Sequence, residues 1–120
     1  MGIGCPLCKI SKGEMKINNY LQNNKILFKN QKTFHNCRSL KNNLLKFDFY
    51  LIDYNICIEY DGEFHYIPLF NNEKYQENLI KTQYHDKIKT QYCLDNNIKL
   101  IRIPYWEFNN IETILEKEIF

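Results

Sequence analysis

The sequence contains no alanine, no valine and only two arginines, although asparagine, isoleucine and lysine are abundant. The scarce residues are those with GC-rich codons, so the bias indicates an AT-rich coding sequence and supports no structural conclusion. It also weakens any argument from the number of lysines or asparagines. Glycine and proline are few, at four and three residues, and 44% of the chain is apolar. This composition excludes a collagen-like or wholly disordered chain and is typical of a soluble globular domain.

Long apolar runs are also missing, and the longest ones are too short to span a membrane. Residues 1–6 contain no basic patch followed by an apolar core, so we expect neither a signal peptide nor a membrane partner. The five cysteines are an odd number without a secretory segment, which predicts free thiols in a reducing, intracellular compartment. A chain of 120 residues fits one domain, and a net charge of +2 neither requires nor excludes a nucleic-acid partner.

The hydrophobic pattern predicts an α/β (α+β) fold in the order α-β-β-β-α-β-α, with helices flanking a mixed sheet. Ser11 and Glu14 have the spacing of a capping box, which predicts a first helix from residue 11 to about 23. The later elements are expected as a strand over 25–34, a loop over 35–44, a β-hairpin over 45–52 and 56–61, a helix over 72–96, a strand over 99–103 and a helix over 110–120.

The predicted hairpin carries acidic residues in an unusual place. In its second strand, Glu59 and Asp61 alternate with apolar residues. A two-residue loop at 53–54 places Asp48 of the first strand directly opposite Glu59, whereas a loop at 54–55 places it opposite Asp61. Either even-length loop gathers the three carboxylates on one face, and a three-residue loop would separate Asp48 from the others.

Carboxylates packed on one face repel each other, and a hard cation such as Mg²⁺ or Mn²⁺ would remove that cost. His65, four residues after Asp61, can act as a base, a proton donor to a leaving group or a further ligand. Each acid taken alone is more typical of a solvated surface residue, and the capping box alone explains Glu14. The hypothesis of a metal site therefore depends on the combination.

Two stretches carry a resemblance to a known family: FDFYLIDYNICIEYDGEFHY at 47–66 and HDKIKTQYCLDNNIKLIRIPYWE at 85–107. They resemble the restriction-endonuclease-like, PD-(D/E)xK nuclease superfamily. Within it, the resemblance is to the branch of very-short-patch repair endonucleases and EDxHD homing endonucleases, whose relatives recur in phages and large DNA viruses. It extends from about residue 4 to 107 and implies a mixed sheet flanked by helices, in agreement with the predicted order of elements.

The resemblance implies a metal-dependent DNA endonuclease that hydrolyses phosphodiester bonds. It implies that Asp48, Glu59 and Asp61 bind the metal, although Asp61 stands where most members carry lysine. It also implies catalytic roles for His65 and for Glu14 on the first helix.

On the long helix, the resemblance marks Asp86 and Lys89 as catalytic residues. Which of His65, His85 and Asp86 corresponds to the HD of the motif stays open. Lys89 either replaces the lysine that is missing from the strand or is an ordinary solvated helix residue. The implied cation would polarise the scissile phosphate and acidify a bound water, while His65 moves a proton.

Several side chains are candidates for contacts with DNA. We expect three lysines to hold phosphates by charge alone: Lys46, Lys81 and Lys87. Three tyrosines are candidates for base stacking: Tyr50, Tyr66 and Tyr105. The single tryptophan, Trp106, is expected to pack against the rest of the protein.

Residues 1–10 contain Cys5 and Cys8 in a C-x-x-C turn that resembles half of a zinc module. Because structural Zn²⁺ takes four ligands, either His35 or Cys37 would help to complete the site, or the module is shortened and binds no zinc. We therefore divide the chain into a partial zinc-knuckle-like segment, 1–10, and an endonuclease-like domain, 11–120. The remaining cysteines, Cys57 and Cys93, are predicted to be buried small hydrophobic residues.

Two alternatives to an enzyme stay open. One is a nuclease fold that binds nucleic acid without cutting it, and the other is a subunit whose partner supplies specificity. The small size and the half zinc module favour the first of these alternatives, whereas the retained acidic residues argue against it. The sequence also leaves open the target site, DNA or RNA as substrate, nicking or double-strand cleavage, and a possible homodimer.

Overall fold

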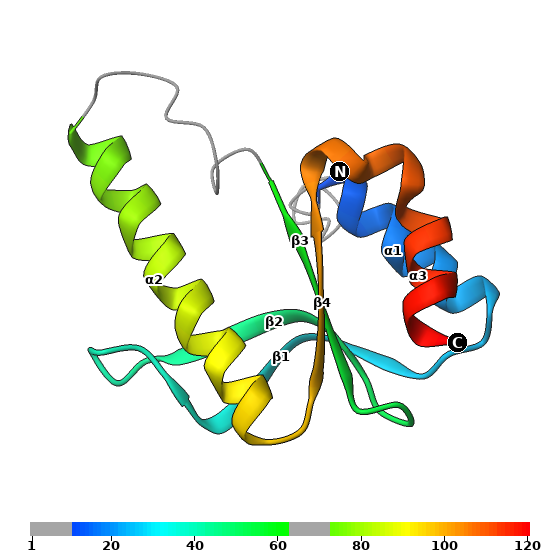
Figure 1. Cartoon of the computed structure of the whole chain (residues 1–120), viewed down its shortest axis with the longest axis horizontal. Helices are drawn as coiled ribbons and strands as arrows, with labels where there is room; N and C mark the ends of the chain where they lie inside the picture. The colour runs from blue at the N-terminus through cyan, green and yellow to red at the C-terminus, as the bar shows by residue number, and fades with distance from the viewer. Residues whose placement is uncertain (1–10, 63–72) are drawn as a thin grey trace, which may run out of the picture.

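The computed structural model describes residues 11–62 and 73–120. Its elements follow the predicted order, with one additional 3-10 helix, η3, before the last α-helix (Figure 1). They are α1 (Lys12–Asn23), β1 (Phe28–Arg38), β2 (Leu44–Leu51), β3 (Ile56–Asp61), α2 (Glu73–Asp95), β4 (Lys99–Pro104), η3 (Tyr105–Asn110) and α3 (Ile111–Ile119). No helix in the described part of the chain has the length and apolar character needed to cross a membrane.

The four strands form one mixed sheet in the order β1-β2-β3-β4. The first three strands are antiparallel neighbours joined by short turns, whereas β4 lies parallel to β3. A parallel neighbour requires a long crossover connection, which α2 provides. The fold is therefore α+β with a mixed sheet and flanking helices, as predicted.

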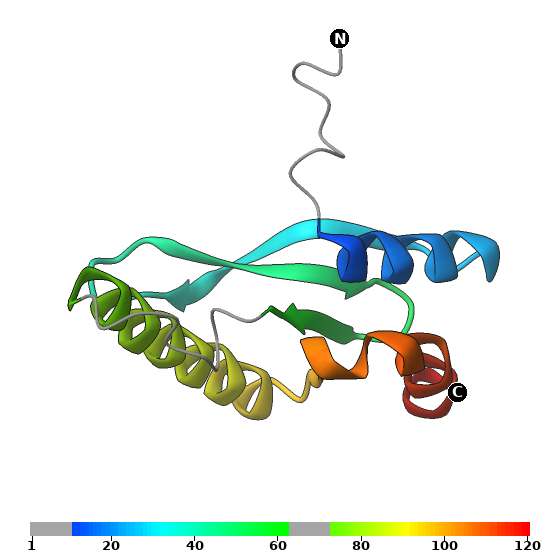
Figure 2. The same cartoon turned by 90° about the horizontal axis from the view of Figure 1, so that it is seen from above.

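The helices enclose two hydrophobic clusters against the sheet. α1 and α3 lie together on one side of Figure 1 and α2 lies on the other, an arrangement that Figure 2 shows from above. The cluster under α1 and α3 includes Phe49, Ile58 and Ile103. The cluster under α2 includes Phe47 and Cys57. Asp48, Glu59 and Asp61 lie between these two clusters, at the end of the sheet where β3 finishes.

Two local predictions have opposite outcomes. The capping box of α1 is present, because the Ser11 side chain accepts from the Glu14 backbone N–H and the Glu14 carboxylate accepts from the Ser11 N–H. The predicted strand over 25–34 is wrong at both ends. Lys25 has a φ of 55° in the turn that ends α1, which delays the strand, and Arg38 pairs with Leu44, which extends it.

Three cysteines lie in the cluster under α2: Cys37, Cys57 and Cys93. All three are buried and none forms a disulfide. This confirms the prediction that Cys57 and Cys93 are small core residues. Because Cys37 is also in the core, of the two proposed zinc partners His35 is the one on the surface. Cys5 and Cys8, with the predicted segment 1–10, lie outside the described residues.

Candidate active site

The strands β2 and β3 separate at the end of their hairpin, and acidic residues occupy the opening. Their pairing includes Leu51 with Ile56 and Phe49 with Ile58. This is the register predicted from a loop at 53–54, and its next step places Asp48 opposite Glu59. Beyond this point β2 continues along β1 while β3 continues along β4, so a gap opens between the two strands.

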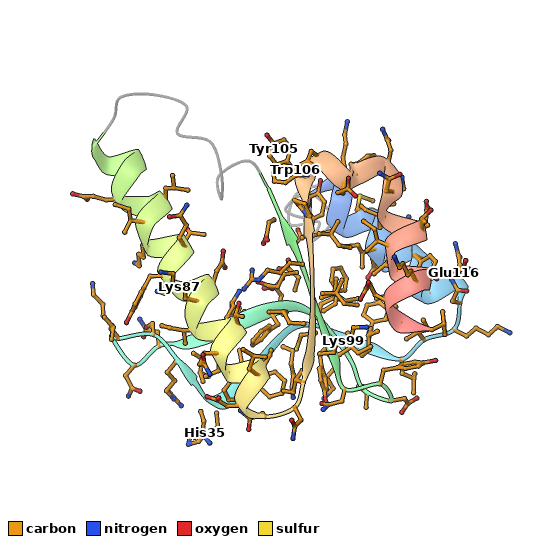
Figure 3. The ribbon with its side chains drawn as sticks, viewed as in Figure 1. His35, Lys87, Lys99, Tyr105, Trp106 and Glu116 are labelled. Atoms are coloured by element: carbon orange, nitrogen blue, oxygen red, sulfur yellow. The ribbon has the colours of Figure 1, made fainter. Side chains whose placement is uncertain are left out.

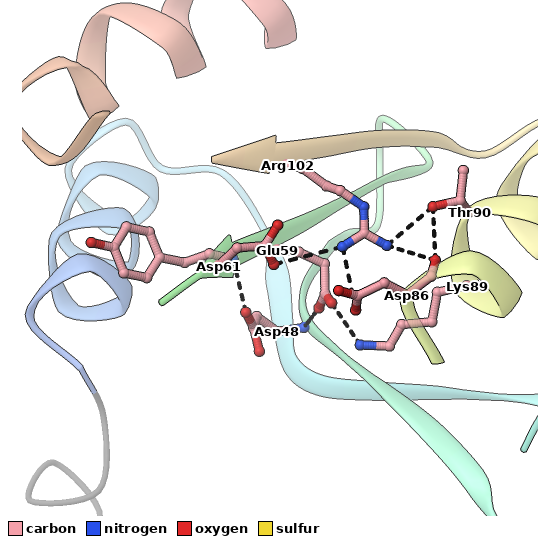
Figure 4. A network of polar contacts seen from close by, with 8 residues as sticks. Asp48, Glu59, Asp61, Asp86, Lys89, Thr90 and Arg102 are labelled. Atoms are coloured by element: carbon pink, nitrogen blue, oxygen red, sulfur yellow. Dashed lines mark hydrogen bonds and ion pairs between the residues drawn. The ribbon is translucent and has the colours of Figure 1, made fainter. Parts of the chain in front are cut away.

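Two reciprocal hydrogen bonds cross this opening (Figure 4). The Asp48 backbone N–H donates to Glu59 Oε2 at 2.8 Å, and the Tyr60 N–H donates to Asp48 Oδ2 at 2.9 Å. The two carboxylate oxygens thus accept hydrogen bonds from backbone N–H groups. If the sheet continued, these N–H groups would donate to backbone carbonyls of the neighbouring strand instead. Both acids are therefore held in fixed positions where the strands separate.

Asp48 also marks a break in the regular alternation of β2. Residues two positions apart in a strand normally share a face, yet Phe47 belongs to the cluster under α2 and Phe49 to the cluster under α1 and α3. In the register of β1 with β2, the residue opposite Asp48 is Gln31, whose φ of 53° is unusual for a non-glycine residue. The irregularity places the Asp48 side chain between the two hydrophobic layers.

Lys89 of α2 supplies a cation to the site. Its Nζ lies 2.6 Å from Glu59 Oε1, and the two side chains are 13% and 4% exposed. The same ammonium group lies 5.3 Å from the centre of the Phe47 ring. Lys89 is therefore a partly buried partner of the site and not the solvated helix lysine of the alternative interpretation.

Arg102 of β4 is a second cation, which the sequence pattern did not predict as part of the site. Its Nη1 lies 3.6 Å from Asp61 Oδ1 and 3.5 Å from Asp86 Oδ1. Its Nη2 donates to the Asp86 carbonyl at 2.9 Å and to Thr90 Oγ1 at 3.1 Å. Arg102 thus joins the carboxylate of β3 to the backbone of α2 (Figure 4).

A cleft of about 300 Å³ contains most of the predicted residues. It is lined by Ser11, Glu14, Asp48, Glu59, Tyr60, Asp61, Gly62 and Lys89. The first turn of α1 reaches this cleft because Gly13 lets the helix approach the Tyr60 ring, which a Cβ at that position would overlap. Glu14 therefore both caps α1 and contributes its carboxylate to the cleft.

The concentration of negative charge has an electrostatic consequence for Asp48. Burial, followed by the charge of Glu59, raises the pKa of Asp48 from 3.8 to about 8, against the opposing effect of the Tyr60 N–H. Glu14 raises this pKa further, and Lys89 lowers it. The cleft thus contains more carboxylate groups than the single positive charge of Lys89 can neutralise.

The donor set suits a hard divalent cation, because Mg²⁺ prefers oxygen ligands and is usually held by one or two carboxylates. Asp48 and Glu59 provide such a pair next to the cleft. Within the described ranges, however, no three His, Cys, Asp or Glu side chains already form an arrangement that could hold a metal ion. A cation here would therefore need water or substrate oxygens to complete its coordination.

The structure brings together five of the seven predicted catalytic residues: Glu14, Asp48, Glu59, Asp61 and Lys89. Asp86 lies one helical turn before Lys89 and contacts Arg102 instead of lining the cleft. The seventh, His65, lies outside the described residues, as does Tyr66.

The three lysines predicted to bind phosphates do not lie together at the cleft. Lys46, Lys81 and Lys87 are all exposed. Lys87, labelled on α2 in Figure 3, is two positions from Lys89, so the two side chains do not share a face of the helix. Lys81 lines a separate groove of about 390 Å³ formed by α2 and the turn between β1 and β2.

The expectation for Trp106 was wrong, because its side chain is 60% exposed. It lies in η3, which follows Pro104 and breaks regular helical geometry at Glu107.

The sequence contained a usable signal for Arg102, since this residue alternates with the apolar residues Ile101 and Ile103 and therefore faces away from their layer. Identifying its partners required knowing that β4 lies beside β3.

Comparison with known proteins adds little to this geometry. No protein-family model matches the chain. The chain is 40% identical over 63 residues to protein 307L of Invertebrate iridescent virus 6, which is described as uncharacterized. The match covers 51% of this chain and 31% of that protein. The chain therefore matches less than a third of the length of its viral relative. The description of this viral relative assigns no activity.

Proposed function

We propose that this protein is a metal-dependent DNA endonuclease of the PD-(D/E)xK superfamily, in the branch of very-short-patch-repair-like and EDxHD homing endonucleases. The main observation in support is the fixed pair of Asp48 and Glu59 at the point where β2 and β3 separate, beside an open cleft. The mixed sheet with flanking helices agrees with the fold that the sequence resemblance implies.

Asp48 and Glu59 would hold Mg²⁺ or Mn²⁺, with Asp61 as a neighbouring carboxylate. The bound ion would polarise the scissile phosphate and lower the pKa of a bound water. Lys89 contacts Glu59 and places a positive charge at the cleft, where it would stabilise charge on the phosphate. It thereby replaces, from α2, the strand lysine whose place Asp61 takes.

Arg102 orients this machinery from outside the cleft. By contacting both Asp61 and Asp86, it fixes α2 relative to β3 and so sets the position of Lys89 one turn along the helix. His65 remains the proposed proton-transfer residue, and a zinc ion at Cys5 and Cys8 remains a separate proposal. Neither depends on the geometry described above.

The test is plasmid cleavage in Mg²⁺ or Mn²⁺ by the parent protein and by Asp48→Asn. We expect the variant to lose at least about 100-fold in rate, since removing even a group that only supports a metal ligand costs about 10- to 100-fold. Asp53→Asn is the matched control, because Asp53 is an exposed acid in the turn at the other end of the hairpin. Equal cleavage by all three proteins would reject the proposed site.

A second candidate function is binding of nucleic acid without cleavage. It is favoured by the ion pairs of Glu59 with Lys89 and of Asp61 with Arg102, which neutralise carboxylates that an enzyme would offer to a metal. Gel-shift binding in EDTA with no cleavage in any divalent metal would support this function. Sedimentation in the same buffers would show whether the protein acts as a homodimer.

A further inference from the structure

The chain has one tryptophan, Trp106, and its side chain is 60% exposed. Its ring meets that of Tyr105 edge to face, with centroids 5.3 Å apart and an interplanar angle of 79°. Large aromatic side chains are normally well buried, although a single exposed one needs no special explanation. The exposure of Trp106 is informative because of where this pair of rings lies in the fold.

Tyr105 and Trp106 follow directly after the strand position that lies beside the cleft. In the register of β3 with β4, Asp61 lies opposite Pro104, and Asp61 lines the cleft. Trp106 is two residues beyond Pro104, so its Cα lies no more than about 12 Å from that of Asp61. Figure 3 shows both rings at the end of the sheet where β3 and β4 finish.

A comparable aromatic pair lies at the opposite end of β3. Tyr54 and Phe120 meet edge to face at 6.0 Å and 87°, and their side chains are 42% and 66% exposed. Tyr54 belongs to the turn that joins β2 to β3, at the far end of β3 from Asp61. The two pairs therefore share edge-to-face ring geometry, and each contains an exposed ring at its terminal residue, Trp106 or Phe120, but they differ in their distance from the carboxylates.

We propose that Tyr105 and Trp106 form a stacking site for a nucleobase of the polynucleotide whose phosphate enters the cleft. This inference rests on the proposed function and adds a base-binding site to it. Each nucleotide step advances about 3.4 Å along a strand, so a base within a few steps of the bound phosphate can reach the rings. Stacking on an indole face tolerates any base but needs the base to be outside a duplex stack.

The single tryptophan provides a direct measurement. Titration of the protein with a fluorescently silent oligothymidylate in EDTA, where a metal-dependent nuclease does not cut, is expected to quench Trp106 emission saturably. A blunt duplex of the same length is expected to quench it less at equal occupancy. Equal quenching by the duplex would overturn the assignment to an unpaired base, and binding without quenching would overturn the stacking site.

Variants separate the role of the ring from that of the fold. Trp106→Ala is expected to weaken binding of a labelled oligothymidylate by about 10-fold in EDTA, and Trp106→Phe by much less because a stacking face remains. Phe120→Ala, in the distant pair, should bind as tightly as the parent. Thermal unfolding of each variant shows that it is folded. Parent-like affinity of Trp106→Ala would reject the proposal.

The outcomes also distinguish this proposal from the proposed function. If the parent protein binds the oligonucleotide with quenching but cuts in no divalent metal, the nuclease assignment fails and the stacking site stands. If Asp48→Asn abolishes cleavage while Trp106→Ala binds normally, only the stacking site fails. If the parent protein binds no nucleic acid, both fail.

Discussion

Among the residues that the structure describes, two lysine–glutamate ion pairs join a helix to the sheet, and they differ mainly in burial. Lys89 of α2 meets Glu59 of β3 at 2.6 Å, with side chains 13% and 4% exposed. Lys99 of β4 meets Glu118 of α3 at 3.1 Å, with side chains 49% and 41% exposed. Water surrounds the second pair and weakens it, whereas the first pair is largely removed from water.

The comparison shows why residue type alone does not identify a functional acid. Glu118 can exchange its lysine for water at little cost, so its pairing carries little information. Glu59 cannot exchange its partners for water in this way. One of its oxygens contacts Lys89, and the other accepts a hydrogen bond from the Asp48 N–H inside the protein. A carboxylate kept in that state costs stability, which is more readily explained by a chemical role than by folding.

Among single substitutions, the largest loss of stability is expected when the buried ion pair is broken. Lys89→Met keeps most of the side-chain volume but leaves Glu59 without its cation, so we expect a loss of about 3 kcal/mol in the free energy of unfolding. Lys99→Met removes the exposed pair and should cost less than about 1 kcal/mol. Urea denaturation at pH 7 measures both. Equal losses would mean that the burial of Lys89 has no energetic consequence.

The sequence predicted the parts of this site that depend on neighbouring residues. The capping box fixed Glu14 at the start of α1, and the alternation in the hairpin placed Asp48 opposite Glu59. The hairpin pattern left Asp61 open as the alternative partner of Asp48, and the structure has the register with Glu59. Both predictions follow from local periodicity and a short turn, which a single sequence contains.

The missed parts depend on contacts between distant segments. Arg102 became recognisable only when β4 was found beside β3, a neighbour relation that no local pattern encodes. The extension of β1 to Arg38 likewise depends on its pairing with Leu44 of β2. Trp106 was expected to pack because tryptophan usually does, but η3 follows Pro104 and leaves it at the surface.

A second comparison within the chain concerns its two described glycines. A Cβ at Gly13 would overlap the Tyr60 ring, whereas a Cβ at Gly62 would meet nothing within 4 Å. Gly13→Ala should therefore cost about 2 kcal/mol by overpacking between α1 and β3, while Gly62→Ala should change stability little. The double variant Gly13→Ala, Tyr60→Leu should recover part of the loss. Denaturant unfolding that ranks the two glycines equally would contradict this packing.

A pH dependence of the stability is also expected, and it originates at Asp48. Its pKa is about 8 in the folded protein and 3.8 as the unperturbed value, so between these pH values the folded state holds a proton that the unfolded state has released. Stability contributed by this group is therefore complete below about pH 4 and is lost as the pH rises toward 8. The slope is about 1.4 kcal/mol per pH unit at most.

Unfolding in EDTA at several pH values measures this slope, and Asp48→Asn should remove it because the amide does not titrate. Asp53→Asn, an exposed acid of the turn, should leave it unchanged. Addition of Mg²⁺ should oppose the loss near pH 8, because a bound cation favours the ionised carboxylate that burial and Glu59 disfavour. A slope that persists in Asp48→Asn would assign the dependence to another group and remove the electrostatic argument for a cation beside Glu59.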